Sequence, residues 1–321
     1  MLVYVTPKLE GELIPYSYRA RATIVAPHIA NCRVTDDIKS LQEGDVAVLG
    51  KKHTREDAEY CIGNEIKYIV DVADDKFEMF KHWYFTIPNA NAVSTTCHAL
   101  KKLIEEETQV KAYVIEDPTE RKKVPPRFRK KDKMVLGYYG AISNFSKLDF
   151  LYIRDTLSKI HPTEFRILTN KPEHMPKPFK GTKVNRYWML RDEMVEYEKK
   201  FKHQYDNMQN WSMKAQDEFY DNCDIILLPV TSDRESRCKG NNRPIDAMWS
   251  GRWVISNPGI PSYEELNDFI WCDNLADGYI KALKNPKEIK NRIKNAQEYI
   301  ERERTPDKIA MKWESLYRGL L

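Results

Sequence analysis

The feature that most constrains the fold is a regular alternation of short apolar runs with segments of helical periodicity. In the first half, runs that predict buried strands cover Leu2–Thr6, Val46–Gly50, Lys67–Ala73, Ala92–Thr96 and Lys111–Glu116. Segments between them, such as Arg55–Glu65 and Cys97–Thr108, have the pattern of helices. Since this alternation is typical of a largely parallel sheet covered by helices, the first half is predicted to be an α/β domain.

The second half repeats the pattern. Its strand candidates are Met134–Tyr139, Glu164–Thr169, Val184–Met189, Asp224–Val230, Arg252–Ser256 and Phe269–Cys272. A chain of 321 residues exceeds the usual size of one hydrophobic core, so two domains with a cleft between them are predicted. The last segment, 286–321, has helical periodicity apart from Thr305-Pro306, where the proline should break the helix.

A basic run joins the two halves. Residues Arg121–Lys131 contain Pro125 and Pro126, and they lack apolar periodicity. This predicts an exposed connection, with the first domain at 1–130 and the second at 131–304. The positive charge of this run has two interpretations. The functional one is a contact to nucleic-acid phosphates, and the structural one is a solvated linker.

Several classes of protein are disfavoured by the sequence. The longest apolar stretches, such as Ile225–Val230, fall far short of the roughly 20 residues needed to cross a bilayer, and no leader pattern is seen, which predicts a cytoplasmic location. The six cysteines form no C-x-x-C pair and have no histidine at zinc-finger spacing, so neither disulfides nor structural zinc are expected. A net charge of +4 is compatible with a polyanionic partner but does not require one.

The most informative segment joins the apolar run Asp224–Val230 to a polar loop and a helix that stops at Gly251. In the loop, Gly240 lets the backbone approach a ligand, and Asn241 and Asn242 are suited to cap the helix. The N-terminus of a helix attracts anions through its free N–H groups and its dipole. The segment therefore predicts an anion-binding loop.

Charged side chains flank this loop. Lys239 and Arg243 have the charge to neutralise a diphosphate without a metal, and Asp246, one turn further, can accept hydrogen bonds from ribose hydroxyls. The plainer interpretation is a surface helix with ordinary capping and solvated charges.

The segment 239–256 resembles the donor-binding core of retaining GT-B glycosyltransferases of the large group-1 class, with Trp249–Val254 matching its glycine turn into a strand. Leu136–Gly140 resembles the opening strand and turn of the family's donor domain, which adds Gly140 to the nucleotide-sugar site. Lys147 stands where the family often has a second phosphate-binding base. The resemblance extends weakly over nearly the whole chain.

In the first half, Val70–Asp75 resembles the family's strand end at the acceptor side of the cleft. The resemblance offers Asp71, Asp74 and Asp75 as groups that orient the acceptor hydroxyl, or as a base if the reaction inverts. A plain cluster of surface carboxylates is the alternative. Tyr18-Arg19 also matches a family position and supports the architecture.

The chain departs from the family at one place. Members commonly have two glutamates separated by seven residues, the first touching the donor sugar and the second the ribose. Here Cys238 and Asp246 stand at these positions. A thiol cannot accept strong hydrogen bonds from sugar hydroxyls, so the resemblance does not identify the sugar, and Glu235 is the nearby carboxylate.

The resemblance implies two Rossmann-like domains facing a central cleft, with a C-terminal helix, 305–321, returning to the first domain. It also implies transfer from a nucleotide-diphosphate sugar, UDP-sugar first, to an acceptor hydroxyl with retention and without a metal. The leading acceptor is a hydroxymethylated or hydroxylated base in duplex DNA, as in phage DNA glucosyl- and arabinosyltransferases. The alternatives are a surface polysaccharide or other glycan, a protein or small metabolite, and, from another class, a non-catalytic binding or scaffold protein.

Overall fold

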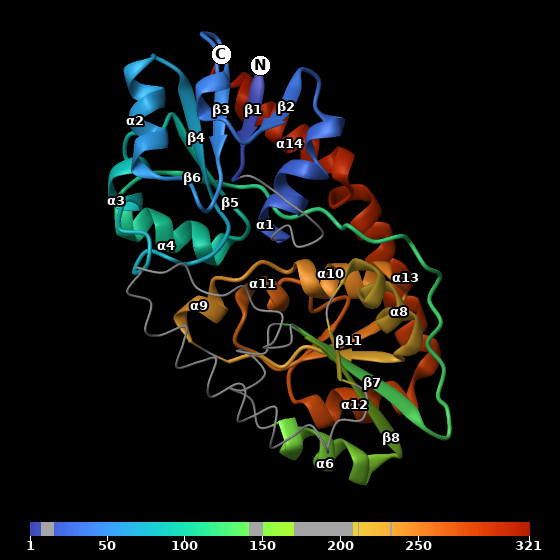
Figure 1. Cartoon of the computed structure of the whole chain (residues 1–321). Helices are drawn as coiled ribbons and strands as arrows, with labels where there is room; N and C mark the ends of the chain where they lie inside the picture. The colour runs from blue at the N-terminus through green and yellow to red at the C-terminus, as the bar shows by residue number, and fades with distance from the viewer. Residues whose placement is uncertain (8–15, 141–149, 170–207, 211, 232) are drawn as a thin grey trace.

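The computed structural model describes residues 1–7, 16–140, 150–169, 208–210, 212–231 and 233–321. Within them the strands form two six-stranded sheets, ordered β2-β1-β3-β4-β5-β6 and β12-β11-β10-β7-β8-β9 (Figure 1). Every strand pair in these sheets is parallel. The first and second domains are named here for the sheet that each contains.

The first sheet contains all five predicted strands. They are β1 (Leu2–Val5), β3 (Val46–Leu49), β4 (Lys67–Val72), β5 (Ala92–Thr95) and β6 (Ala112–Val114). The edge strand β2 (Cys32–Thr35) was not predicted, because its side chains are only partly buried and form no apolar run. The helices of this domain are α1 (Tyr16–Tyr18), η1 (Arg19–Thr23), η2 (Ala26–His28), η3 (Ile38–Ser40), α2 (Arg55–Gly63), α3 (Trp83–Thr86) and α4 (His98–Thr108).

The second sheet contains β7 (Met134–Tyr139), β8 (Thr163–Thr169), β9 (Met208–Asn210), β10 (Ile225–Leu227), β11 (Trp253–Ser256) and β12 (Trp271–Cys272). The three-residue β9 was not predicted, and the predicted strand Val184–Met189 lies outside the described residues. The helices are α6 (Phe150–Ile160), α8 (Met213–Asn222), α9 (Arg234–Arg237), α10 (Asn242–Trp249), α11 (Pro261–Glu264), α12 (Leu275–Lys284), α13 (Pro286–Glu303) and α14 (Pro306–Arg318).

Side chains alternate between two apolar layers on each sheet, as the period of a strand requires. In β1, Val3 packs on one face while Leu2 and Tyr4 pack on the other. In β10, Ile226 packs on one face while Ile225 packs on the opposite one. Both sheets are thus covered on both faces, which explains why their strands are continuous apolar runs.

The last two helices divide between the domains. α13 packs on the second domain through Ile289 and Ile300, whereas α14 packs against β1, with the Trp313 ring 5.4 Å from the Tyr4 ring. The break falls at the expected place, because Pro306 cannot continue α13 but suits the first position of α14. The predicted return of the C-terminal helix to the first domain is confirmed (Figure 1).

The basic connection is less exposed than predicted. The Arg121 guanidinium is buried and donates to the Asp217 carboxylate and the Gln216 side-chain oxygen of α8, both at 3.0 Å. Phe128 is buried in the core of the second domain, where it covers apolar side chains that would otherwise face water. The charged residues between them are mostly exposed. The domain boundaries after residues 130 and 304 stay predictions.

No helix in the described residues is both long enough and apolar enough to span a bilayer.

Candidate functional site

The second sheet reverses its strand order between β7 and β10, with β8 and β9 on one side and β11 and β12 on the other. In open α/β sheets, ligands bind beyond the carboxyl ends of the strands at such a reversal. The chain leaves β10 there and forms α9 and then α10, which lie on the side of the second domain that faces the first (Figure 1). The loop Lys239–Asn241, called here the α10 loop, is therefore at the right place for a ligand.

The N-terminus of α10 has no side-chain cap. Asn241 occupies the cap position, but its Oδ1 accepts from Arg304 Nη2 at 2.8 Å and its Nδ2 donates to the Ser262 carbonyl at 3.2 Å. Asn242 is already the first helical residue. The prediction that these asparagines cap the helix is wrong, because a buried arginine competes for Asn241. Within the described residues, the first-turn N–H groups of Asn242 and Arg243 are left without a side-chain acceptor, which suits an anion.

The far end of α10 follows the sequence prediction. Gly251 has a φ of +74°, the left-handed conformation that commonly ends a helix. A side chain here would also meet the connection, since an added Cβ would lie 2.6 Å from the Pro125 carbonyl oxygen.

The α10 loop approaches the first domain closely. A Cβ added to Gly240 would lie 3.4 Å from Thr96 Oγ1 and 3.7 Å from Asp117 Oδ2, which are ordinary contact distances, so the loop passes directly beside these two residues. The hydroxyls of Thr96 and Tyr16 are buried and find no hydrogen-bond partner in the described part of the chain. Buried polar groups of this kind are uncommon and accord with a ligand or water at this interface.

Arg243 is fixed over the carboxyl end of β7. Its Nε donates to the Tyr263 hydroxyl at 3.1 Å and its Nη1 to the Tyr139 carbonyl at 3.3 Å, while its own carbonyl accepts from the Tyr139 hydroxyl at 2.8 Å. A Cβ on Gly140 would lie 3.0 Å from Arg243 Nη1. The structure thus brings Gly140 and Arg243 together, as the resemblance implies.

Lys239 is half-buried beside Arg243. Burial lowers the pKa of Lys239 and the charge of Arg243 lowers it further, against the opposing effect of Glu235, Asp74 and Asp233. Lys239, Arg243 and the first-domain residue Asp74 therefore act on one another across the interface between the domains. Lys147 lies outside the described residues.

Asp246 is only 2% exposed and holds the connection in place. One of its oxygens accepts from the Thr119 hydroxyl at 3.0 Å and the Glu120 backbone N–H at 3.3 Å. Burial raises the pKa of Asp246 to about 7, the charge of Glu120 adds to the rise, and Arg121 opposes it. Its predicted role toward a ribose stays a prediction.

Asp71 and Asp74 differ in their surroundings. Both Asp71 oxygens are bound by the Arg21 guanidinium, at 2.5 and 2.6 Å, and the Ser94 hydroxyl donates to one of them at 2.7 Å. Three donors thus occupy the two oxygens of Asp71 and hold them in place, so neither oxygen is free to take the proton of an acceptor hydroxyl. Asp74 is partly exposed and pairs with Lys51.

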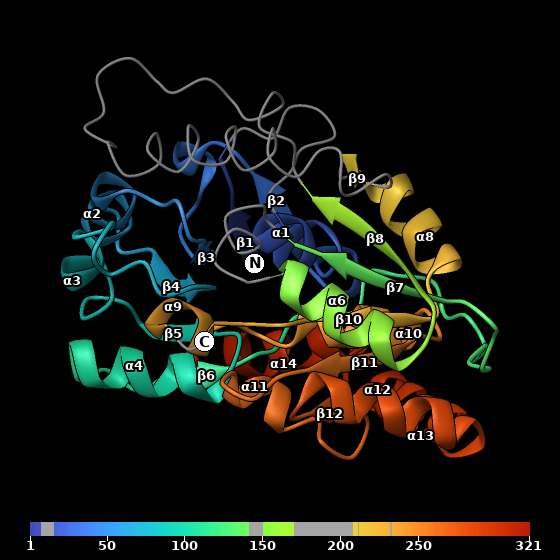
Figure 2. The same ribbon diagram turned by 90° about the horizontal axis from the view of Figure 1, so that it is seen from below.

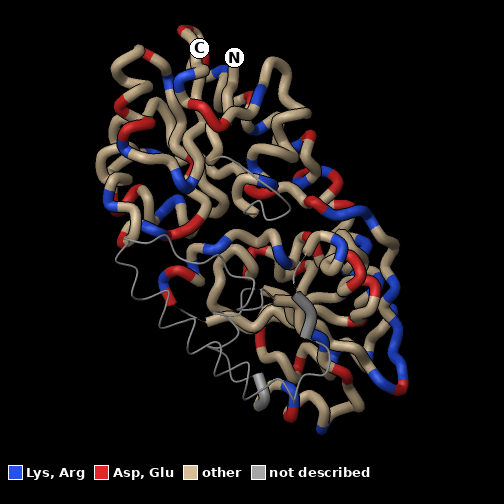
Figure 3. Tube along the Cα trace, viewed as in Figure 1, with Lys and Arg blue, Asp and Glu red and all other residues tan. Residues whose placement is uncertain are grey.

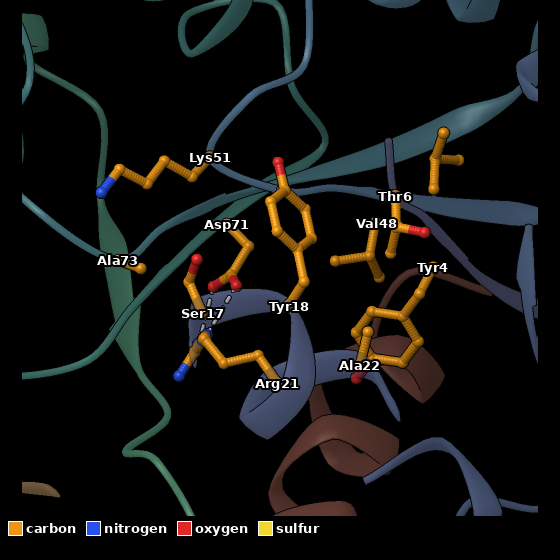
Figure 4. A pocket seen from close by; sticks show the side chains of 12 residues that line it. Tyr4, Thr6, Ser17, Tyr18, Arg21, Ala22, Val48, Lys51, Asp71 and Ala73 are labelled. Carbon is orange, nitrogen blue, oxygen red and sulfur yellow. Dashed lines mark hydrogen bonds and ion pairs between the residues drawn. The ribbon is translucent and has the colours of Figure 1, made fainter. Parts of the chain in front are cut away.

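A small pocket lies at the carboxyl ends of β1, β3 and β4, between these strands and α1 (Figure 4). Polar groups lining it include Thr6, Ser17, Tyr18, Lys51 and Asp71. The Tyr18 hydroxyl is anchored because it accepts from the Lys52 backbone N–H at 2.6 Å. With a volume of about 10 Å³, the pocket itself holds no more than a water-sized group.

Two residues near the departure from the family pattern contact the first domain. Cys238 is 6% exposed and packs in the core of the first domain, where the Cys97 thiol lies 3.4 Å from its carbonyl oxygen. Glu235 accepts from Lys76 at 2.6 Å. Asp75 is likewise engaged across the interface, by Arg234 at 2.8 Å. Asp75 and Glu235 thus join the domains in this structure.

Sequence reasoning did not find Arg304, Ser262 or Tyr263, which hold the α10 loop and Arg243. None of them belongs to a recognisable spacing, and each reaches the site through tertiary packing alone.

No family model matches the sequence, and no curated protein matches it significantly. Solved structures do match. HepE from Anabaena, in complex with UDP-glucose, has a TM-score of 0.70 at 11% identity over 99% of both chains. An α,α-trehalose-phosphate synthase (UDP-forming) from Burkholderia vietnamiensis has a TM-score of 0.61 at 12% identity, over 88% of this chain and 76% of that one. TarM has a TM-score of 0.57 at 13% identity, over 85% of this chain.

The chain has the GT-B fold. The neighbours are GT-B glycosyltransferases, and at these identities the likeness concerns the fold alone. This chain spans about half the length of TarM, with 54% covered. The predicted architecture of two Rossmann-like domains is confirmed.

Proposed function

We propose that this protein is a glycosyltransferase that moves a sugar from a nucleotide-diphosphate sugar, most simply a UDP-sugar, to an acceptor hydroxyl. The observation that carries the proposal is the uncapped N-terminus of α10, flanked by Lys239 and Arg243 and opening toward the first domain. The HepE neighbour was solved with UDP-glucose, which supports the choice of UDP.

In this proposal the diphosphate lies against the first turn of α10. The backbone N–H groups of Asn241, Asn242 and Arg243 bind it, together with the side-chain cations of Lys239, Arg243 and Lys147. Gly240 and Gly140 leave room for the close approach. Asp246 is proposed to receive the ribose. Because the cations already supply positive charge, we expect binding without a metal.

The proposed reaction retains the configuration at the anomeric carbon. The bond from that carbon to the diphosphate oxygen breaks, a bond to the acceptor oxygen forms on the same face, and the acceptor proton passes to the diphosphate. Lys239, Arg243 and the helix terminus stabilise the charge that develops on the leaving diphosphate. No nucleophile from the protein is needed.

The acceptor is proposed to enter from the first domain, near the pocket of Figure 4. Asp71 and Asp74 both border this region as candidate orienting groups. Asp74 is the stronger candidate, because Asp71 has both oxygens bound by Arg21.

A hydroxylated base in duplex DNA is the first acceptor to test, as in a phage-type modification, within a cytoplasmic setting. It is supported by exposed lysines and arginines along the connection (Figure 3), namely Lys122, Lys123, Arg127, Arg129, Lys130 and Lys131. This run leads into the start of β7, about 20 Å from the end of that strand at the site. A duplex bound there must extend along the second domain and extrude the base. A glycan acceptor is the alternative.

The test is nucleotide binding in EDTA by calorimetry, with UDP, GDP, ADP and CMP, for the wild type, Lys239→Ala and the control Lys214→Ala, an exposed lysine of α8. We expect UDP to bind the wild type and the control, and Lys239→Ala to bind about tenfold or more weakly, because a charge-assisted contact is lost. Equal UDP affinity in all three proteins contradicts the site.

Transfer is then assayed from UDP-sugars to hydroxymethylated duplex DNA and to glycans, with the anomeric configuration of the product determined. UDP binding without transfer to any acceptor favours the non-catalytic binding protein.

A further inference from the structure

Arg304 lies at the break between α13 and α14 and is only 1% exposed. A buried guanidinium is costly unless its donors are satisfied. Its Nε and Nη2 donate to the Asp117 carbonyl at 3.1 and 2.9 Å, and Nη2 also donates to Asn241 Oδ1 at 2.8 Å. Within the described part of the chain, all three hydrogen bonds go to uncharged oxygens.

These partners come from separate parts of the chain. Asp117 follows β6 at the start of the crossing into the second domain, and Arg304 stands in the return crossing. The two crossings are also joined by a backbone hydrogen bond from the Thr119 N–H to the Arg304 carbonyl at 2.8 Å. Asn241 belongs to neither crossing, since it ends the α10 loop. The guanidinium therefore ties the α10 loop to both connections between the domains.

The contact with Asn241 decides what that side chain does. Asparagine is among the best capping residues, and Asn241 stands at the cap position of α10, yet its oxygen is turned to Arg304. Its nitrogen is held by the Ser262 carbonyl, and the Ser262 hydroxyl in turn donates to the Lys239 carbonyl at 2.6 Å. The loop is thus held in a form that leaves its own helix uncapped.

We propose that Arg304 is a positioning residue that draws Asn241 away from the cap of α10 and so keeps the helix N-terminus open for a diphosphate. The proposal rests on the proposed function, because it assigns the open terminus to the donor diphosphate. Without Arg304, the Asn241 oxygen can turn to the backbone N–H of Arg243 and compete with the ligand for it. Arg243 is the target of the cap because Pro244, the next residue, has no N–H.

The experiment measures the binding of UDP and of inorganic pyrophosphate to the wild type, Arg304→Met, Asn241→Ala and the double variant. We expect Arg304→Met to weaken both ligands about fivefold, the factor that corresponds to a cap of ~1 kcal/mol. Asn241→Ala alone keeps every backbone N–H of the loop and gives the reference affinity for the double variant. In the double variant the competing oxygen is gone, so the affinity should rise above that of Arg304→Met to that of Asn241→Ala.

If Arg304 only stabilised the fold, the double variant would bind the ligands no more tightly than Arg304→Met. A double variant without this recovery of affinity overturns the inference while the donor site stands. Unchanged affinity in Arg304→Met has the same meaning. If pyrophosphate binds the wild type and UDP does not, the donor assignment fails and the pyrophosphate series still decides the inference. Binding of neither ligand to the wild type overturns both. If Arg304→Met does not fold, Arg304→Gln takes its place in both backgrounds.

Discussion

Position 238 accommodates a cysteine because its side chain points away from water. Cys238 packs with Cys97 in the core of the first domain, although it belongs to the second. A carboxylate in that place would be buried among apolar groups and repelled by Asp75, while the charges of Arg234 and Arg237 would offset part of that cost. The family glutamate therefore has no equivalent here in this arrangement, and any contact to the donor sugar must come from other residues.

We predict that Cys238→Glu lowers the free energy of unfolding by roughly 2–4 kcal/mol, since it places a larger, charged side chain in an apolar core. Cys238→Ala, which only removes the sulfur, should cost about 1 kcal/mol. Urea denaturation of the two variants measures the difference. Equal stability of the two would mean that the side chain at 238 reaches the solvent of the cleft.

A buried histidine makes the first domain sensitive to acid. His53 Nδ1 donates to the Gly50 carbonyl at 2.8 Å, and its Nε2 shares a hydrogen bond with the Thr86 hydroxyl at 2.9 Å. Burial lowers the pKa of His53 to about 4, and the neighbouring His82 adds to this while the Gly50 carbonyl opposes it. Between about pH 6.5 and pH 4, His53 is therefore protonated in the unfolded chain and neutral in the folded chain.

The contribution of neutral His53 to the free energy of unfolding is therefore fully present above about pH 6.5. As the pH falls toward 4, the free energy of unfolding falls by up to roughly 3 kcal/mol. His53→Gln keeps a donor and an acceptor but cannot titrate. Thermal melts from pH 7 to pH 4.5 should show a steeper fall for the wild type than for this variant. Parallel pH profiles would show that His53 does not contribute.

At the scale of elements, α9 and its neighbours close the interface between the domains. Arg234 donates to Asp75 at 2.8 Å and to Glu107 of α4 at 2.7 Å, and Glu235 accepts from Lys76. α9 lies beside α4 in both views (Figures 1 and 2). Arg234 is 50% exposed, so salt screens these pairs and each adds little to stability.

We predict that the double variant Arg234→Ala/Lys76→Ala opens the interface with a stability change of less than about 1 kcal/mol. Small-angle scattering should give a larger radius of gyration than for the wild type, and 0.5 M salt should produce a similar change in the wild type. Lys294→Ala, which breaks an exposed pair within α13, is the control. An unchanged radius in the double variant would show that other contacts hold the domains together.

The sequence predicted elements better than it predicted contacts. The inner strands were found because they are buried on both faces, and the α10 segment because Gly251 and the charges at Lys239 and Arg243 are local signals. The edge strand β2 was missed because it lacks an apolar run. The hydrogen bond of the Asn241 side chain was not predicted, because its partner Arg304 is 63 residues away in the sequence and no local pattern indicates that contact.

For the whole molecule, the return of α14 makes the first domain depend on the end of the chain. Trp313 is fully buried against Tyr4, and the Arg21 guanidinium that binds Asp71 lies 5.4 Å from its ring. The first domain therefore completes its core only after the second domain has been made. A defect in α14 should weaken the first domain while the nucleotide site of the second is still formed.

We predict that Trp313→Ala lowers the stability of the first domain by about 3–5 kcal/mol, since a large ring is removed from a packed core. Calorimetry should then resolve an early transition that UDP does not shift, followed by a later one that UDP raises, because a ligand stabilises only the unit that binds it. Met311→Ala, an exposed residue of the same helix, should melt like the wild type. If Trp313→Ala instead melts in a single transition whose midpoint temperature UDP raises, the two domains unfold as one unit. The contacts between the domains, with Arg304 at their centre, would then couple both halves.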